Sequence, residues 1–298
     1  MRENEFGFCH VRKNVAGKNT DALSGLMSLD GNNVNLIAGM LGCNLGCWFC
    51  FADGLSKGDQ NPSSFERFDP SVVVLEASKT PSRTLQFGGG EPSLHLEWVI
   101  QACYAAKAHQ VRTNMLTNGY VQPWVASALA RVLDGCTVGV KGCASPEVYS
   151  RLGVDPGPVL ESLRIFYHHM VSGGVIGNIV GPGLPGCVEN AETFGRWIRD
   201  NLSPNARVGI APECQVGLSR YVLASPAEKT LEMAREVEKR LRGVGLLNVD
   251  VIDLSEWNNM LDLHPNQSDD RERVEGAWHE QNQGDHGNHD LIRYQSAS

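Results

Sequence analysis

The chain lacks three features that would mark a membrane protein, an exported protein or a general nucleic-acid-binding protein. None of its apolar runs approaches the roughly 20 residues that a helix needs to cross a bilayer. Its polar start, Met1-Arg-Glu-Asn-Glu-Phe6, does not resemble a secretory signal. Positive charge is also scarce, because 34 acidic against 26 basic residues give a formal net charge of −8. We therefore expect a cytoplasmic protein without a broad nucleic-acid-binding surface.

The cysteines do not form the pattern of a disulfide scaffold. There are nine of them in 298 residues, and without an export signal we expect reduced thiols and metal ligation. Six are scattered and are expected to be small buried apolar side chains: Cys9, Cys103, Cys136, Cys143, Cys187 and Cys214. Two of these six, Cys143 and Cys214, each follow a predicted strand end, which leaves a functional role open for them.

The other three cysteines lie in one short segment, Cys43-Asn-Leu-Gly-Cys47-Trp-Phe-Cys50. Three thiolates from one loop can hold three corners of a cubane iron–sulfur cluster and leave the fourth iron open to a small molecule. Gly42 and Gly46 would help the loop to close tightly. A zinc site is the alternative, but zinc requires a fourth ligand, and no Cys or His follows at zinc-finger spacing.

Short apolar segments alternate with helix-like segments between residues 33 and 253. The predicted strands are 34–40, 84–87, 111–117, 137–140, 175–180 and 208–211, with 249–252 as a candidate seventh. The predicted helices are 94–109, 123–133, 158–170, 188–201 and 226–242. This alternation implies parallel βαβ units with right-handed crossovers. We predict an α/β fold, a partial (β/α)6 barrel with parallel strands and with its active loops at the carboxyl ends of the strands.

Polar segments flank the predicted barrel. We expect an N-terminal extension over residues 1–32, the barrel over 33–253, and a mobile C-terminal tail over 254–298. Four histidines of this tail could bind a metal, but their spacing does not fit one helix face, so we expect them to be solvated: His264, His279, His286 and His289.

Phe49, just before the last cysteine, offers an aromatic face beside the metal, and we expect it in the cofactor site. The cysteine spacing with this aromatic residue resembles that of the radical S-adenosylmethionine (radical SAM) superfamily. In that family the amino and carboxylate groups of S-adenosylmethionine bind the open iron of a [4Fe–4S] cluster. Reduction then cleaves the sulfonium to a 5′-deoxyadenosyl radical, which abstracts a hydrogen atom. The resemblance covers about residues 30–220. It implies that Cys43, Cys47 and Cys50 hold the cluster, and that flavodoxin or ferredoxin supplies the electron.

Two further segments resemble cofactor-binding motifs of this family. Gly88-Gly89-Gly90-Glu91-Pro92 is similar to the GGE motif, which implies that Gly89, Gly90 and Glu91 bind the amino group of S-adenosylmethionine. Glycines allow close backbone approach, and a carboxylate suits an ammonium group. Gly177-Asn-Ile179-Val-Gly181 looks like the G-x-I-x-G element, which implies that Ile179 packs against the adenine, although an ordinary buried strand has a similar sequence.

Other motifs narrow the resemblance to activases such as the pyruvate formate-lyase activating enzyme. Asp30-Gly31 precedes Cys43 by the interval found in that branch, and Thr117-Asn118-Gly119-Tyr120 and Pro182-Gly183 match its TNG and PG motifs. The resemblance implies that Asn118 lies near the ribose or amino group of the cofactor. It also implies that Lys141 pairs with the cofactor carboxylate, although a lysine at a strand end can also reach solvent.

The chain departs from the activase pattern at several positions. Asn32-Asn33-Val34-Asn35 replaces the usual Pro-Gly-Ile-Arg, Gly139 replaces the aspartate of a D-x-K pair, and Leu116 replaces an acid. Glu213 and Cys214 stand where the activases have a histidine. These changes weaken the prediction that the substrate is a glycyl radical enzyme.

Two further observations concern the number of clusters and the amino end of the chain. No ferredoxin-like insert separates Cys50 from Gly88, so we expect a single cluster. Cys9-His-Val-Arg-Lys-Asn-Val-Ala-Gly-Lys18 resembles the lead-in of the AmmeMemoRadiSam branch, a sister group of the activases.

We therefore predict a radical SAM enzyme that abstracts a hydrogen atom from a small-molecule or peptide substrate. Glu213 or Cys214 could act there as an acid–base or hydrogen-atom group. One alternative is an activase that generates a glycyl radical on a partner enzyme. Alternatives of other classes are a non-catalytic iron–sulfur protein for electron transfer or sensing, and a zinc-bound structural module.

Overall fold

Eight strands form one sheet, in the order β1 to β8. The computed structural model describes residues 10–13, 36–50, 56, 68–170, 174–213 and 227–251, and the structural statements below refer to this part of the chain. Strand β1 (His10–Lys13) runs antiparallel to β2 (Leu36–Met40), and the seven strands from β2 to β8 are parallel. The predicted α/β class, an incomplete barrel of parallel strands, is confirmed.

The strands after β2 follow the predicted segments closely. They are β3 (Thr84–Gly89), β4 (Arg112–Thr117), β5 (Gly135–Lys141), β6 (Val175–Val180), β7 (Arg207–Pro212) and β8 (Asn248–Val251). The candidate seventh strand is therefore present, which makes seven parallel strands rather than six. Strand β1 lies within residues 1–32, where the sequence indicated only a polar extension.

The helices connect the strands in the predicted places, with two additions. They are α3 (Pro70–Ser78), α4 (Leu96–Ala108), α5 (Pro123–Ala130), α6 (Pro146–Arg151), α7 (Gly157–His169), α8 (Ala191–Asn201) and α9 (Ala227–Gly243), with short 3₁₀ turns η2 (Pro92–His95) and η3 (Gly142–Ala144). Helices α3 and α6 were not predicted, although each has a capping signal. Asp69 accepts a hydrogen bond from Ser71 N before α3, and Ser145 accepts one from Val148 N before α6.

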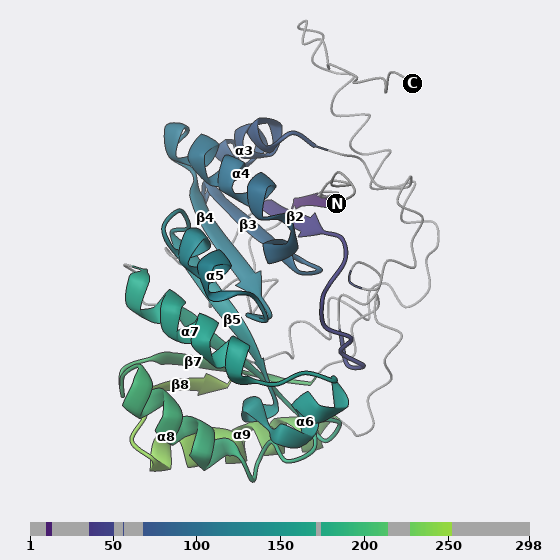
Figure 1. Ribbon diagram of the computed structural model, residues 1–298, viewed down its shortest axis with the longest axis vertical. Helices are drawn as coiled ribbons and strands as arrows, with labels where there is room; N and C mark the ends of the chain where they lie inside the picture. The colour runs from purple at the N-terminus through teal and green to yellow at the C-terminus, as the bar shows by residue number, and fades with distance from the viewer. Residues whose placement is uncertain are drawn as a thin grey trace, which may run out of the picture.

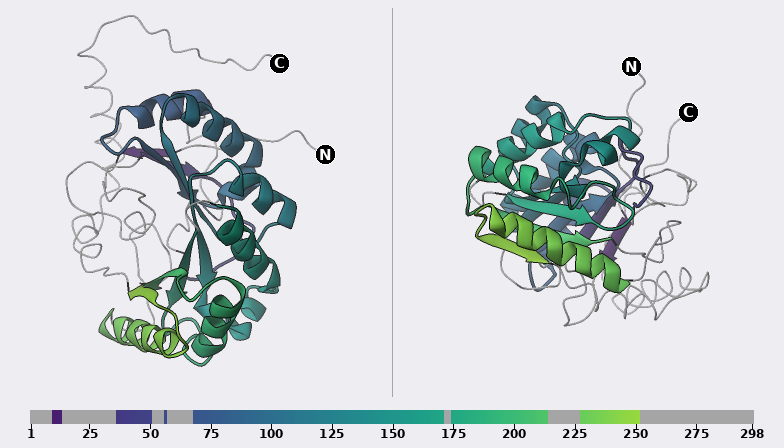
Figure 2. Two further views of the ribbon diagram at one scale, coloured as in Figure 1. Left: turned by 90° about the vertical axis from the view of Figure 1, so that its left-hand side faces the viewer. Right: turned by 90° about the horizontal axis from the view of Figure 1, so that it is seen from below.

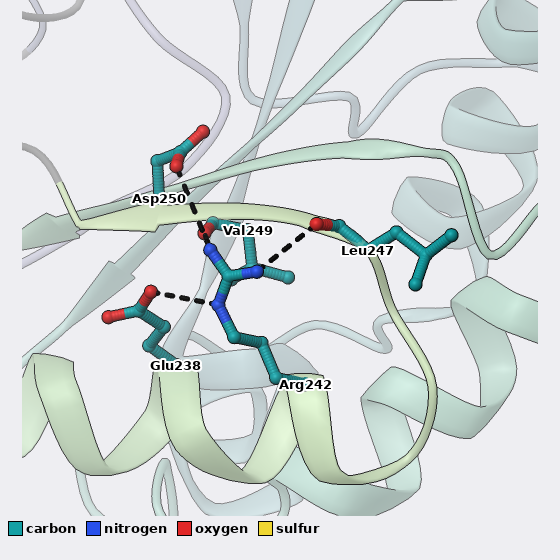
Figure 3. Close-up of polar contacts among 5 residues, drawn as sticks. All are labelled: Glu238, Arg242, Leu247, Val249 and Asp250. Carbon is teal, nitrogen blue, oxygen red and sulfur yellow. Dashed lines mark hydrogen bonds and ion pairs between the residues drawn. The ribbon is translucent and has the colours of Figure 1, made fainter.

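Arg242 fastens α9 to β8, as Figure 3 shows. Its guanidinium donates to the Val249 carbonyl and, at 3.1 Å, to the Leu247 carbonyl. The same group lies 3.0 Å from the Glu238 carboxylate and 3.8 Å from that of Asp250. These contacts hold the last strand of the sheet against its helix.

The two faces of the sheet have different neighbours (Figures 1 and 2). Helices α3, α4, α5, α7, α8 and α9 lie on one side, which we call the outer face. There, for example, Phe87 of β3 meets Trp98 of α4 edge-on, with 6.1 Å between ring centroids. Side chains alternate along a strand, so the inner face carries the intervening residues: Ile37, Gly39, Gln86, Gly88, Asn114, Leu116, Thr137, Gly139, Lys141, Val175, Gly177, Ile179, Gly209 and Ala211.

Candidate iron–sulfur and cofactor site

The cysteine loop begins where β2 ends and is joined to the end of β3. Gly90 N donates to the Met40 carbonyl and Glu91 N to the Gly42 carbonyl, both at 2.8 Å. A Cβ on Gly90 would lie 2.1 Å from the Gly42 carbonyl oxygen, so only glycine fits there. Gly42 itself has a φ of +80°, which also favours glycine. The glycines of the GGE motif therefore allow the strand end to contact the cysteine loop.

Gly46 differs from Gly42. It does not share the left-handed φ, and no atom of the described residues lies within 4 Å of the position that a Cβ would take. The expectation that glycine helps the loop to close tightly is therefore supported by the backbone at Gly42, and not at Gly46.

Two of the three sulfur atoms, those of Cys43 and Cys50, have polar neighbours within hydrogen-bond distance. Cys43 Sγ accepts hydrogen bonds from Leu45 N and Asn118 Nδ2, both at 3.4 Å, and Cys50 Sγ lies 3.3 Å from Ser56 Oγ. Hydrogen bonds to the ligand sulfurs are one of the means by which proteins tune iron–sulfur clusters. Within the described ranges, no three His, Cys, Asp or Glu side chains converge on one point suited to a single metal ion. The donor set and its spacing fit a cubane cluster, whose irons are held by separate thiolates.

Burial and the charge of Lys141 act in opposite directions on two of these thiols, while the Glu91 carboxylate adds to the effect of burial on the pKa of Cys43. Burial raises the pKa of Cys43, and it raises the pKa of Cys47 to about 11. The Lys141 ammonium group lowers the pKa of both. Because iron binds the thiolate form, Lys141 supplies a positive charge where the bound cluster would be negative.

The Glu91 carboxylate joins the ends of β3 and β4. It is 1% exposed, and it accepts hydrogen bonds from Ser93 N at 3.0 Å, from Thr117 Oγ1 at 2.7 Å and from Asn118 N at 2.7 Å. A carboxylate has about four lone-pair sites, so most of its capacity is used within the chain. The structure thus shows a bracing contact that the sequence did not reveal, while binding of the cofactor amino group stays a prediction.

Asn118 connects the TNG motif to the cysteine loop. Its Nδ2 donates to Cys43 Sγ and, at 2.8 Å, to Asn44 Oδ1, while its Oδ1 accepts from Tyr120 N at 2.7 Å. Asn44 Nδ2 returns a bond to the Tyr120 carbonyl at 2.6 Å. The sequence predicted only a cofactor role for Asn118, and its hydrogen bond to the sulfur of Cys43, a predicted cluster ligand, was not foreseen.

Lys141 ends β5 and lies over Gly139 on the inner face. A Cβ on Gly139 would lie 3.1 Å from Lys141 Nζ, so the lysine occupies space that a larger residue would need. In the activases an aspartate stands at the position of Gly139. Behind the lysine, its backbone N–H donates to the hydroxyl of the fully buried Tyr149 at 3.4 Å.

Helix α6 contacts the cysteine loop through Arg151. The guanidinium carbon of Arg151 lies 4.0 Å from the centroid of the Trp48 ring, a cation–π contact. Trp48 in turn meets the buried Phe49 edge-on, with 4.9 Å between centroids. This contact was missed because α6 itself was not predicted.

The remaining predicted site residues lie at the ends of β6 and β7. Ile179 is on the inner face, beside Lys141 and Ala211 in register. Glu213 is 4% exposed, and its carboxylate accepts a hydrogen bond from Gly183 N at 2.9 Å. Gly181 makes room for it, since a Cβ there would lie 2.4 Å from the Glu213 side chain. Glu213 thus holds the PG turn, and its acid–base role stays a prediction.

Four predictions fall outside the described residues. They concern Cys9, Asp30-Gly31, Cys214 and the tail 254–298 with its histidines. The other scattered cysteines are all buried, as expected: Cys103, Cys136, Cys143 and Cys187. Burial raises the pKa of Cys103 and of Cys143 to about 12, so both are neutral thiols near pH 7.

Comparison with known proteins identifies the family. The family model of the radical SAM superfamily matches residues 37–190, which is more than half of the chain. The chain belongs to the radical SAM superfamily. The match spans the cysteine loop, the GGE and TNG motifs and the G-x-I-x-G element, so it covers the edge of the sheet described above. No helix in the described ranges of this radical SAM protein is long and apolar enough to span a membrane.

The relatives of this radical SAM protein are distant, and two of the three described next are longer than this chain. An uncharacterised protein of Methanocaldococcus jannaschii, MJ0808, is 24% identical over 219 residues, 70% of this chain and 62% of that protein. Streptococcus suis SuiB bound to its precursor peptide SuiA has a TM-score of 0.55 at 16% identity, covering 76% of this chain and 50% of SuiB. A domain of a pyruvate-formate lyase-activating enzyme from Bacteroides vulgatus has a TM-score of 0.45 at 15% identity, covering 56% and 96%. This chain therefore spans about half to three-fifths of the length of MJ0808 and SuiB, and SuiB shares its fold.

Proposed function

We propose that this chain binds a [4Fe–4S] cluster through Cys43, Cys47 and Cys50, with S-adenosylmethionine on the fourth iron. We further propose that it abstracts a hydrogen atom from a small-molecule or peptide substrate. The observation that carries the proposal is the convergence of three motifs at one edge of the sheet. The cysteine loop is bonded to the GGE motif through Gly90 and to the TNG motif through Asn118.

The residues of the chain have distinct tasks in this function. When bound, the cluster and S-adenosylmethionine would supply the 5′-deoxyadenosyl radical chemistry of the superfamily. Asn118 orients Cys43, and Glu91 holds Asn118 in place. Lys141 offers its ammonium group to the cofactor carboxylate, a charge-assisted contact. Buried Phe49 closes the site on the protein side and excludes water.

A small-molecule or peptide substrate is favoured over a glycyl radical enzyme. Gly139 stands where the activases have the aspartate partner of Lys141, so the carboxylate–lysine pair of that branch is absent from this strand. SuiB, a longer protein with the same fold, has been solved with a precursor peptide bound. We expect flavodoxin or ferredoxin to supply the electron.

Anaerobic reconstitution followed by reduction tests the proposal. We expect about four irons and four labile sulfides per chain, and 5′-deoxyadenosine once S-adenosylmethionine and dithionite are added. Cys43→Ala, Cys47→Ala and Cys50→Ala should each abolish both the bound iron and sulfide and the formation of 5′-deoxyadenosine. Cys103→Ala, which removes a buried thiol of α4, should retain the cluster and the activity. A colourless protein with zinc and no sulfide would support the structural module instead. A cluster that ignores S-adenosylmethionine would support the electron-transfer alternative.

A further inference from the structure

The inner face of the sheet carries several glycines between its larger side chains. Gly39 of β2 lies opposite Gly88 of β3, and Gly139, Gly177 and Gly209 form a row across β5, β6 and β7. Glycine within a strand weakens it and often marks a place where a ligand approaches the backbone. Gly88 is buried, yet no atom of the described residues lies within 4 Å of where its Cβ would be. Glycines alone do not define a site, but they leave room for one.

Two buried side-chain oxygens on the same face have no hydrogen-bond partner among the described residues. They are Gln86 Oε1 and Thr137 Oγ1, from residues that are 4% and 1% exposed. Thr137 lies along the inner face, because its Cγ2 would be 3.0 Å from a Cβ on Gly177. A buried polar oxygen without a partner costs free energy in the folded chain. A ligand that donates to these oxygens would recover it.

These side chains lie below the cofactor motifs. Gln86 is two residues before Gly88, which opens the GGE motif, and Thr137 is four residues before Lys141. At about 3.3 Å per residue, Thr137 is roughly 13 Å from the level of Lys141 along β5. Strand β4 lies between them, with Asn114 beside Gln86 and Leu116 beside Thr137 in register. Both residues therefore lie on the inner face, below the level of the cofactor motifs.

We infer that Gln86 and Thr137 form a substrate subsite for uncharged amide groups, such as successive backbone amides of an extended peptide, because the two residues lie two strands and two positions apart, roughly 12 Å from Cα to Cα. The inference rests on the proposed function and specifies its substrate class. An amide N–H matches the Gln86 carbonyl oxygen, and an amide carbonyl matches the Thr137 hydroxyl as a donor. At this level of the inner face, the side chains of β3, β4 and β5 are uncharged, so a charged group would be desolvated without an ionic partner. The glycines allow a flat group to approach the strands.

Binding of a small amide to the reconstituted full-length chain tests the subsite. The probe is N-acetylglycinamide, and its matched control is N-acetylsarcosine dimethylamide, which lacks N–H donors. Saturation-transfer NMR should show binding of the first and not of the second. Gln86→Met and Thr137→Val should weaken binding about five- to tenfold, the loss of roughly one hydrogen bond. Ser162→Ala should not, because this buried hydroxyl without a partner lies on α7, on the outer side.

Thermal unfolding provides a second readout that separates a binding role from a structural one. Removing a buried oxygen that bonds nothing in the folded chain is neutral or stabilising, so Thr137→Val should keep or raise the Tm while losing the probe. A Tm lowered by several degrees, unchanged probe binding, or equal binding of the donor-free control would each overturn the inference. Formation of 5′-deoxyadenosine by the wild-type chain is measured in parallel. Its absence would contradict the proposed function, whereas the probe and Tm results decide the subsite by themselves.

Discussion

The outer and inner faces of the sheet are built from the same strands but follow opposite rules. In β3, Leu85 and Phe87 are fully buried against helices, while Gln86 and Gly88 alternate with them on the inner face. In β5, Val138 and Val140 face outward, and Thr137, Gly139 and Lys141 face inward. The outer face maximises buried apolar area. The inner face carries glycines and polar side chains in place of some apolar ones. It therefore contributes less to stability, which is the cost of a site built directly on strands.

The largest expected effect is at Gly90, where the inner face meets the cysteine loop. Gly90→Ala would place a Cβ 2.1 Å from the Gly42 carbonyl oxygen, so the loop must separate from β3. We expect loss of most bound iron and of 5′-deoxyadenosine formation after reconstitution. Gly46→Ala is the matched control, and it should bind iron normally because its Cβ meets no described atom. Equal iron content in the two variants would contradict the fastening role of Gly90.

Neighbouring positions on β3 test the two faces directly. Phe87→Ala, on the outer face, should lower the free energy of unfolding by about 3–5 kcal/mol because it leaves a cavity beside Trp98. Gly88→Ala, one residue later on the inner face, should change it by less than about 1 kcal/mol. Urea denaturation of the apo chain measures both. If Gly88→Ala were as damaging as Phe87→Ala, the inner face would be as tightly packed as the outer one.

Substitution of Asn118 tests how a hydrogen bond at the edge of the inner face affects the proposed cluster. Asn118→Ala removes the hydrogen bond to Cys43 Sγ and leaves the partly buried Tyr120 N–H without its acceptor, so we expect a loss of about 1 kcal/mol in unfolding free energy. Because a donor to sulfur is lost, the reduction potential of the cluster should become more negative. Asn190→Ala, which removes a 2.7 Å bond to the Cys143 carbonyl, should cost stability without moving the potential.

The smallest expected effect is at Arg151, on the exposed side of the cysteine loop. Arg151→Ala removes the cation–π contact with Trp48, worth about 0.5–1 kcal/mol at an exposed site. The emission of Trp48, taken as the difference from a Trp48→Phe background, should shift in the variant. Arg164→Ala, which breaks only an exposed pair with Glu161, serves as the control and should leave that emission unchanged.

The sequence predicted the features that depend on residues close together in the chain. It did not predict the contacts that depend on how neighbouring strands are aligned. The cysteine spacing, the GGE motif and the strand alternation are short patterns, and they predicted the family, the fold and the edge of the sheet. The bonds from Glu91 to Thr117 and Asn118 join residues 26 and 27 positions apart, so they depend on how β3 and β4 align. Helix α6 is too short for a clear apolar period, so its contact with Trp48 could not be foreseen.

The most direct test of the cluster site is the electron paramagnetic resonance spectrum of the reduced full-length chain, recorded with and without S-adenosylmethionine. A radical SAM site with an open fourth iron predicts a [4Fe–4S] signal whose g values change when the cofactor is added, and the change should disappear in Cys47→Ala. A cluster signal that is identical with and without S-adenosylmethionine would contradict the assignment of the cysteine loop as a cofactor-binding site.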